Sequence, residues 1–151
     1  MRHAKAGELP GGPDFERALK PRGRSDSAAA GKWLRERGYQ PDAVICSAAR
    51  RTRQTWQYVS EALGAPADFS AQQRLYEADA DEVIEIIGET PADVGTLLYI
   101  GHNPAAADAV AILTGQEPPF PTAAIAVIGV GNWDELGAGA GDLLASWIPE
   151  H

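Results

Sequence analysis

The sequence of 151 residues is poor in several residue types, and each shortage narrows what the protein can be. A single cysteine, Cys46, cannot form an internal disulfide, so nothing requires an oxidising compartment and a cytoplasmic location is expected. No apolar run is long enough to cross a bilayer, and the first residues lack the pattern of a secretory leader, so no membrane partner is expected. No His, Cys and carboxylate residues have zinc-site spacing, so we expect neither a metal nor another cofactor.

Basic residues are absent from the second half of the chain. All 13 Lys and Arg lie between Arg2 and Arg74, together with 8 acidic residues, which gives residues 1–74 a charge of +5. Residues 75–151 contain 13 acidic residues and no basic one, and the whole chain carries −8. Such an acidic protein is a poor general binder of nucleic acid, so no nucleic-acid partner is expected. The basic half could create a positive field for an anionic substrate, unless folding interleaves the halves and averages the charge.

Alternating strand and helix patterns predict an α/β fold. Short apolar runs are typical of buried strands and occur at residues 43–46, 96–100, 123–130 and 143–148. Helical patterns occur at residues 26–37, 48–63, 79–87 and 104–113. Gly38 and Gly64 follow two of these helices as stop signals, and Asn103 is expected to cap the last one with Pro104 at its first position. We therefore predict a single three-layer α/β/α domain over residues 1–151 with a mostly parallel sheet.

Two residues with suitable chemistry come just after predicted strands, where open α/β sheets bind their ligands. Arg51 lies on the apolar face of its predicted helix, whereas Arg50 and Arg53 share a polar face. An arginine on the apolar side needs an anionic partner, which could be a ligand or a buried carboxylate, and the sequence leaves both open. His102 follows a strand at a helix start, where free N–H groups favour anions. A thiol nucleophile is not expected, because cysteine phosphatases need Cys-x5-Arg and Cys46 has Thr at that distance.

Three motifs along the chain resemble those of the histidine phosphatase superfamily, which has the phosphoglycerate-mutase-like fold. The start Arg2-His3-Ala4 is similar to the family's Arg-His-Gly, and Gly101-His102 is similar to its later Gly-His. Between them, Ser-Ala-Ala-Arg-Arg-Thr-Arg-Gln-Thr at residues 47–55 is similar to Ser-Pro-x-x-Arg-x-x-Gln-Thr. The short length and the Arg-His-Ala-Lys-Ala start resemble the small SixA-type branch, whose members remove phosphate from phosphohistidine.

This resemblance implies a role for each motif residue. His3 would be the nucleophile and become transiently phosphorylated, while Arg2, Arg51 and His102 would hold the phosphoryl oxygens. Phosphoryl transfer depends mainly on positioning and on stabilising charge at these oxygens, and guanidinium groups supply flat forks of donors. Larger relatives use a glutamate as general acid, and Glu77 in Leu-Tyr-Glu could supply it. We favour a helix-entry role for Glu77, because phosphohistidine is a good leaving group that needs little acid help.

The chain departs from the family pattern at three points. Ala4 replaces a glycine, and Ala48 replaces a proline. The apolar strand that precedes Arg-His in the family is missing, because the chain reads Met1-Arg2-His3. We therefore expect either that the first strand is truncated or that His3 is poorly held at an unanchored chain end. Three functions stay open: a phosphohistidine phosphatase acting on a phosphorylated protein, a phosphomonoesterase for small phosphoesters, and a non-catalytic phosphate-sensing or scaffold protein.

Overall fold

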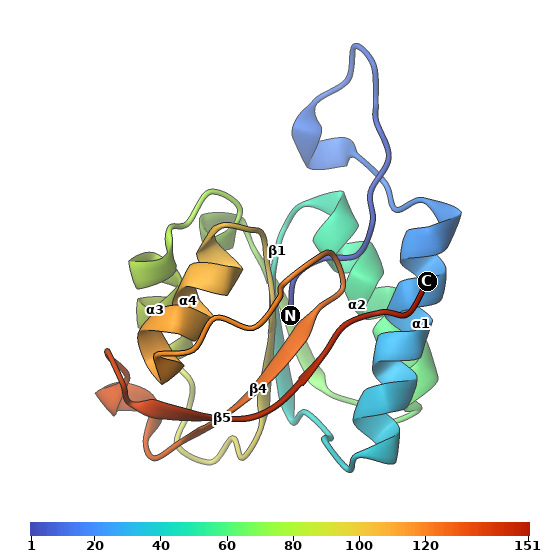
Figure 1. Ribbon diagram of the computed structural model, residues 1–151. Coiled ribbons are helices and arrows are strands. Elements are labelled where there is room, and N and C mark those ends of the chain that lie inside the picture. Colours follow the sequence, from blue (N-terminus) through green and yellow to red (C-terminus); the bar gives the residue numbers. More distant parts are fainter.

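A parallel sheet forms the middle layer of the computed structural model, which describes residues 1–151 (Figure 1). Its strands lie in the order β2 (Asp68–Gln72), β1 (Ala43–Ser47) and β3 (Leu97–Ile100), and both neighbouring pairs are parallel. The expected strands at residues 43–46 and 96–100 are confirmed. Strand β2 was missed, because it is an edge strand whose side chains are mostly exposed and carry no apolar run.

Four helices cover the two faces of this sheet (Figure 1). One layer contains α1 (Pro21–Glu36) and α2 (Arg50–Leu63), and the other contains α3 (Ala80–Ile87) and α4 (Ala105–Thr114). A separate apolar core lies on each side of the sheet, which confirms the predicted three-layer α/β/α arrangement. Close packing of α1 on α2 needs Gly31, because a Cβ there would collide with the backbone oxygen of Val59. None of the helices combines the length and apolar character needed to span a membrane.

The ends of the helices differ from the expected ones in two places. Helix α1 begins at Pro21, five residues before the expected Asp26, because proline is well suited to the first turn. Helix α4 begins at Ala105 with Pro104 as its N-cap residue, so the expected Asn103 cap is one residue off. The C-terminal signals are confirmed, since Gly38 and Gly64 adopt φ of 77° and 70° just after α1 and α2.

An antiparallel hairpin completes the molecule. Strands β4 (Ile125–Val130) and β5 (Gly141–Trp147) pair with each other, with a shift in register between Val127 and Ile128. The prediction of a mostly parallel sheet therefore holds for β1, β2 and β3 but not for these two strands. Both occupy roughly the chain segments in which strands were expected.

The first three residues lie between the end of β3 and the segment that leads into β4. The Met1 amino group donates to the Tyr99 carbonyl at 2.8 Å, and the His3 N–H donates to the Gly101 carbonyl at 2.9 Å. On the other side, the Arg2 N–H donates to the Ala124 carbonyl at 3.0 Å. The expectation of a poorly held His3 is wrong, because backbone hydrogen bonds fix this short segment from both sides.

Residues 1–3 do not form a strand of the sheet. Arg2 forms a single parallel bridge with Gly101. Beyond it, a groove of about 930 Å³ runs between β3 and β4, and 20 of its 27 lining residues are hydrophobic, among them Leu98 and Val127. An apolar groove therefore lies beside the N-terminal segment that contains His3.

Candidate active site

The residues predicted from the three motifs meet in one open cleft of about 460 Å³. His3 comes from the N-terminal segment, Arg51 from the start of α2 just after β1, and His102 from the residues just after β3. The rings of His3 and His102 are 5.3 Å apart between centroids. Arg2 also lines this cleft. The carboxyl ends of β1 and β3 thus bring Arg51 and His102 together, and the N-terminal segment beside β3 adds His3.

His3 is held as a neutral ring with one free nitrogen. Its side chain is buried, with the residue 9% exposed, and its Nδ1 lies 2.8 Å from the Ala4 carbonyl oxygen. Because a carbonyl only accepts, Nδ1 carries the proton and Nε2 keeps its lone pair. Burial lowers the pKa of His3 to about 3, and the neighbouring His102 and Arg51 add to this effect. The ring is therefore neutral near pH 7, with an unprotonated Nε2.

His102 is neutral for similar reasons. Its Nδ1 lies 3.3 Å from Nη2 of Arg51, and since arginine can only donate, Nδ1 is the acceptor. The other nitrogen, Nε2, then carries the proton and donates to Oγ of Ser47 at 2.8 Å. Burial, with Arg51 nearby, lowers the pKa of His102 to about 4. Ser47, at the end of β1, therefore fixes the orientation of this ring.

The two arginines present donors that the protein itself does not use. Arg51 is 6% exposed, which confirms that it faces inward, while Arg50 and Arg53 are exposed as predicted. The buried Nε atoms of Arg51 and Arg2 have no hydrogen-bond partner. Such unused buried donors are costly unless an anion can reach them. The carboxylate that pairs with Arg51 belongs to Asp14, which is half-exposed at the cleft, and not to the protein core.

Two further residues of the second motif hold the cleft together. Thr55 Oγ1 accepts from the Ala4 N–H at 3.0 Å and donates to the Arg51 carbonyl at 2.7 Å. Gln54 Oε1 accepts from the Leu19 N–H at 2.8 Å. The motif thus contributes Arg51 to the cleft and also ties the N-terminal segment that contains His3 to α2. Sequence reasoning missed these roles, although a polar threonine on the apolar face of a helix was a usable signal.

The mouth of the cleft contains residues that the sequence did not single out. Asp14 begins a short 3-10 helix (Asp14–Glu16), and its carboxylate accepts from Arg17 Nε at 2.9 Å and from Tyr76 Oη at 2.6 Å. Tyr76 also packs edge-on against His102, with ring centroids 5.8 Å apart. No sequence motif marks Asp14, because its partners come from three separate parts of the chain.

The remaining candidates lie in less suitable surroundings. Glu77 lines the cleft but is exposed to solvent. Cys46 faces the core of the domain, and burial raises the pKa of its thiol to about 12, so it is no nucleophile. The start of α4 does not provide the expected anion site, since the Ala106 and Ala107 N–H groups already bond His102 and Asn103. Nowhere do three His, Cys, Asp or Glu side chains gather so that they could hold a metal ion.

Comparison with known proteins agrees with this geometry. Residues 1–95 match the family described as histidine phosphatase superfamily, branch 1. The uncharacterized protein Rv1276c of Mycobacterium tuberculosis is 38% identical over 161 residues, which cover 99% of both chains.

Solved structures show the same fold. A structure from Nakamurella multipartitia, provisionally assigned as the phosphohistidine phosphatase SixA, superimposes with a TM-score of 0.87 at 31% identity and covers 99% of this chain and 93% of its own. The protein histidine phosphatase SixA complexed with tungstate gives a TM-score of 0.83 at 27% identity, over 97% of this chain and 92% of its own. The chain therefore has the phosphoglycerate-mutase-like fold of these SixA structures and belongs to branch 1 of the histidine phosphatase superfamily.

Proposed function

We propose that this protein is a phosphohistidine phosphatase that transfers the phosphoryl group through His3. The observation that carries this proposal is the neutral His3 ring, whose Nδ1 is occupied by the Ala4 carbonyl while Nε2 remains free in a cleft lined by Arg2, Arg51 and His102. A neutral imidazole next to unused guanidinium donors suits attack on a phosphorus atom whose oxygens need charge stabilisation.

In the first step, Nε2 of His3 attacks the phosphorus atom and forms a new N–P bond. The N–P bond of the substrate breaks, and its electron pair goes to the imidazole ring of the substrate. That ring already carries a proton on its other nitrogen, so it leaves as neutral imidazole. Arg2, Arg51 and His102 surround the phosphoryl oxygens, and the guanidinium donors of the two arginines stabilise their charge as the group moves.

In the second step, a water molecule attacks the phosphorus atom of phosphorylated His3. The new N–P bond breaks, its electron pair returns to Nε2, and orthophosphate is released together with the proton of the water. The Ala4 carbonyl keeps the Nδ1 proton in place throughout, at 2.8 Å in the free protein. With that proton the phosphorylated ring is cationic, which makes it a good leaving group for hydrolysis.

The nature of the leaving group supports phosphohistidine over a phosphomonoester. An alkoxide needs a proton from a general acid, whereas a protonated imidazole does not. Glu77, the general-acid candidate from the sequence, is exposed to solvent. One similar SixA structure is described as a phosphohistidine phosphatase and another as a protein histidine phosphatase. The second contains tungstate, a tetrahedral oxyanion.

Phosphate release from two substrates tests the proposal. A protein phosphorylated on histidine and an alkyl phosphoester such as glycerol phosphate are incubated separately with the wild-type protein and with His3→Ala. The expected result is turnover of the phosphohistidine protein that depends on His3, with a much lower kcat/KM for the ester. Faster turnover of the ester would favour the phosphomonoesterase, and binding of phosphate without turnover of either substrate would favour the phosphate-sensing alternative.

A further inference from the structure

Asp14 is bound to the same arginine that the proposed reaction needs. Nη2 of Arg51 donates to Oδ2 of Asp14 at 3.0 Å, and Nη1 of Arg51 donates to its backbone carbonyl at 2.9 Å. Both terminal nitrogens of the arginine are therefore engaged by one residue. In the free protein, Asp14 supplies the anion that the buried arginine requires.

The two partners are buried to very different extents. The Arg51 side chain is 7% exposed, whereas that of Asp14 is 53% exposed. Asp14 lies on a segment that leaves the body of the molecule after the N-terminal residues and returns at α1 (Figure 1). A carboxylate that reaches a buried arginine from the solvent side can be replaced there by another anion, because water can hydrate the displaced carboxylate.

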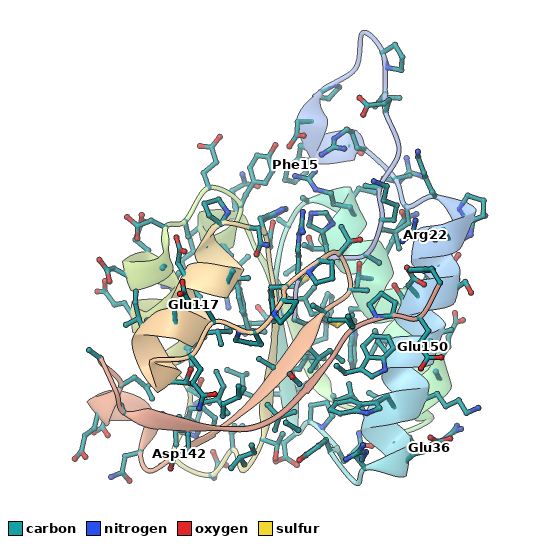
Figure 2. All side chains as sticks on the ribbon, viewed as in Figure 1. Phe15, Arg22, Glu36, Glu117, Asp142 and Glu150 are labelled. Carbon is teal, nitrogen blue, oxygen red and sulfur yellow. The ribbon has the colours of Figure 1, made fainter.

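Two contacts would keep Asp14 near the cleft after it has left Arg51. Arg17 Nε and Tyr76 Oη bind its carboxylate at 2.9 Å and 2.6 Å, independently of Arg51. Phe15, the next residue, packs edge-on against the Tyr76 ring with centroids 5.0 Å apart and lies where the segment meets the body of the molecule (Figure 2). The hydrogen bond from Tyr76, with those from Arg17 and Arg51, holds the pKa of Asp14 well below its usual range, so it stays ionised.

In-line transfer determines which part of the substrate meets this carboxylate. His3 is buried and the Asp14 side chain is half-exposed, so a leaving group on the solvent side of the phosphorus atom would lie near Asp14, Arg17 and Tyr76, which line the same cleft. A carboxylate there favours a leaving group that carries a proton on its ring and disfavours one that develops negative charge.

We propose that Asp14 is a specificity-determining residue. Any phosphoryl group must first displace it from Arg51. The displaced carboxylate then selects a protonated imidazole over an ester oxygen as leaving group. The selection rests on the proposed phosphohistidine phosphatase activity, while the displacement does not. Asp14 thus weakens the binding of simple anions, because they compete with it, and in return favours substrates whose leaving group is neutral or cationic.

The test compares Asp14→Asn with Glu16→Gln. Asparagine keeps the size of the side chain and removes its charge, and Glu16 is an exposed acid on the same short helix that does not line the cleft. Two quantities are measured for each protein: the Kd for inorganic phosphate by calorimetry, and the ratio of kcat/KM for a phosphohistidine protein to that for p-nitrophenyl phosphate. Circular dichroism checks that each variant is folded.

For Asp14→Asn we expect phosphate to bind roughly tenfold more tightly and the substrate ratio to fall by roughly 3- to 100-fold, the range for one unit charge at a few ångströms. Glu16→Gln should leave both quantities within about twofold of the wild type. Asp14→Glu should restore part of the substrate ratio, which a merely structural defect would not predict.

Equal phosphate affinity of Asp14→Asn and the wild type would overturn the displacement. Tighter phosphate binding with an unchanged substrate ratio would overturn the selection. If the wild type hydrolyses neither substrate, the proposed function fails and the selection fails with it, but the phosphate Kd still decides whether Asp14 competes for Arg51.

Discussion

Replacing Thr55 by valine would remove the hydrogen bond that joins the segment containing His3 to α2. Thr55 and Ala4 are both fully buried, and the Thr55 hydroxyl is the acceptor for the Ala4 N–H at 3.0 Å. Valine has nearly the same shape, so the change removes the hydroxyl without leaving a cavity. The Ala4 N–H then has no partner in a buried site, which should lower the free energy of unfolding by about 1–3 kcal/mol.

The same change should slow the reaction. Ala4 follows His3 directly, and its carbonyl fixes the His3 ring through Nδ1 at 2.8 Å. A displacement of about 1 Å at a reacting atom can cost roughly a hundredfold in rate, so we expect kcat to fall by about 10- to 100-fold with little change in KM. Urea unfolding gives the stability, and phosphate release from a phosphohistidine protein gives kcat.

Two further variants make this prediction specific. Ser27→Ala removes another buried hydroxyl, one that donates to the Gly23 carbonyl within α1 at 2.7 Å, and should cost about 0.5–1.5 kcal/mol of stability without lowering kcat. Thr55→Ser restores the hydroxyl and should recover most of kcat. If Thr55→Val lost stability but kept the wild-type kcat, the hydrogen bond to Ala4 would not position the nucleophile.

Arg51→Ala should lower kcat/KM by roughly 10²–10³ while Arg53→Ala leaves it nearly unchanged, because only Arg51 is buried in the cleft; similar losses in both would refute the face assignment. The pKa of His3 falls from 6.5 to about 3 on folding, so between these pH values the unfolded chain binds more protons than the folded one. The free energy of unfolding therefore decreases as the pH drops, by at most about 1.4 kcal/mol per pH unit for this group. His3→Asn should remove this part of the slope in urea unfolding between about pH 4.5 and 6.5, and an unchanged slope would contradict the low pKa. Adding about five apolar, β-forming residues before Met1, a typical strand length, should raise the Tm by filling the groove between β3 and β4, and an unchanged Tm would show that the groove does not take a strand.

Much of the fold could be predicted because its buried elements have clear patterns. The apolar runs of β1 and β3 and the glycine signals after α1 and α2 placed Arg51 and His102 at the same edge of the sheet. Strand β2 could not be found this way, because it is held by backbone pairing at an exposed edge. The secure position of His3 was missed for the same reason, since it depends on backbone hydrogen bonds that no side chain reveals.

The least predictable part of the site is its mouth. Asp14 approaches Arg51 because the segment before α1 folds back on itself, with the Gly7 N–H bonded to the Ala18 carbonyl at 2.9 Å. The conformation of such a segment depends on turns and on distant contacts such as that of Tyr76, and not on any periodic pattern. Motifs could therefore indicate the residues expected to hold the phosphoryl group, but they could not indicate Asp14, whose carboxylate binds Arg51.

Trapping the phosphorylated protein tests the central proposal most directly. The wild-type protein is mixed with a protein that carries radiolabelled phosphohistidine, quenched in alkali within the first turnover, digested and mapped by mass spectrometry. Label should appear on His3, disappear at longer quench times as orthophosphate forms, and be absent from His3→Ala. Label on His102, or turnover by the wild type with no labelled intermediate at any quench time, would contradict the assignment of His3 as the nucleophile.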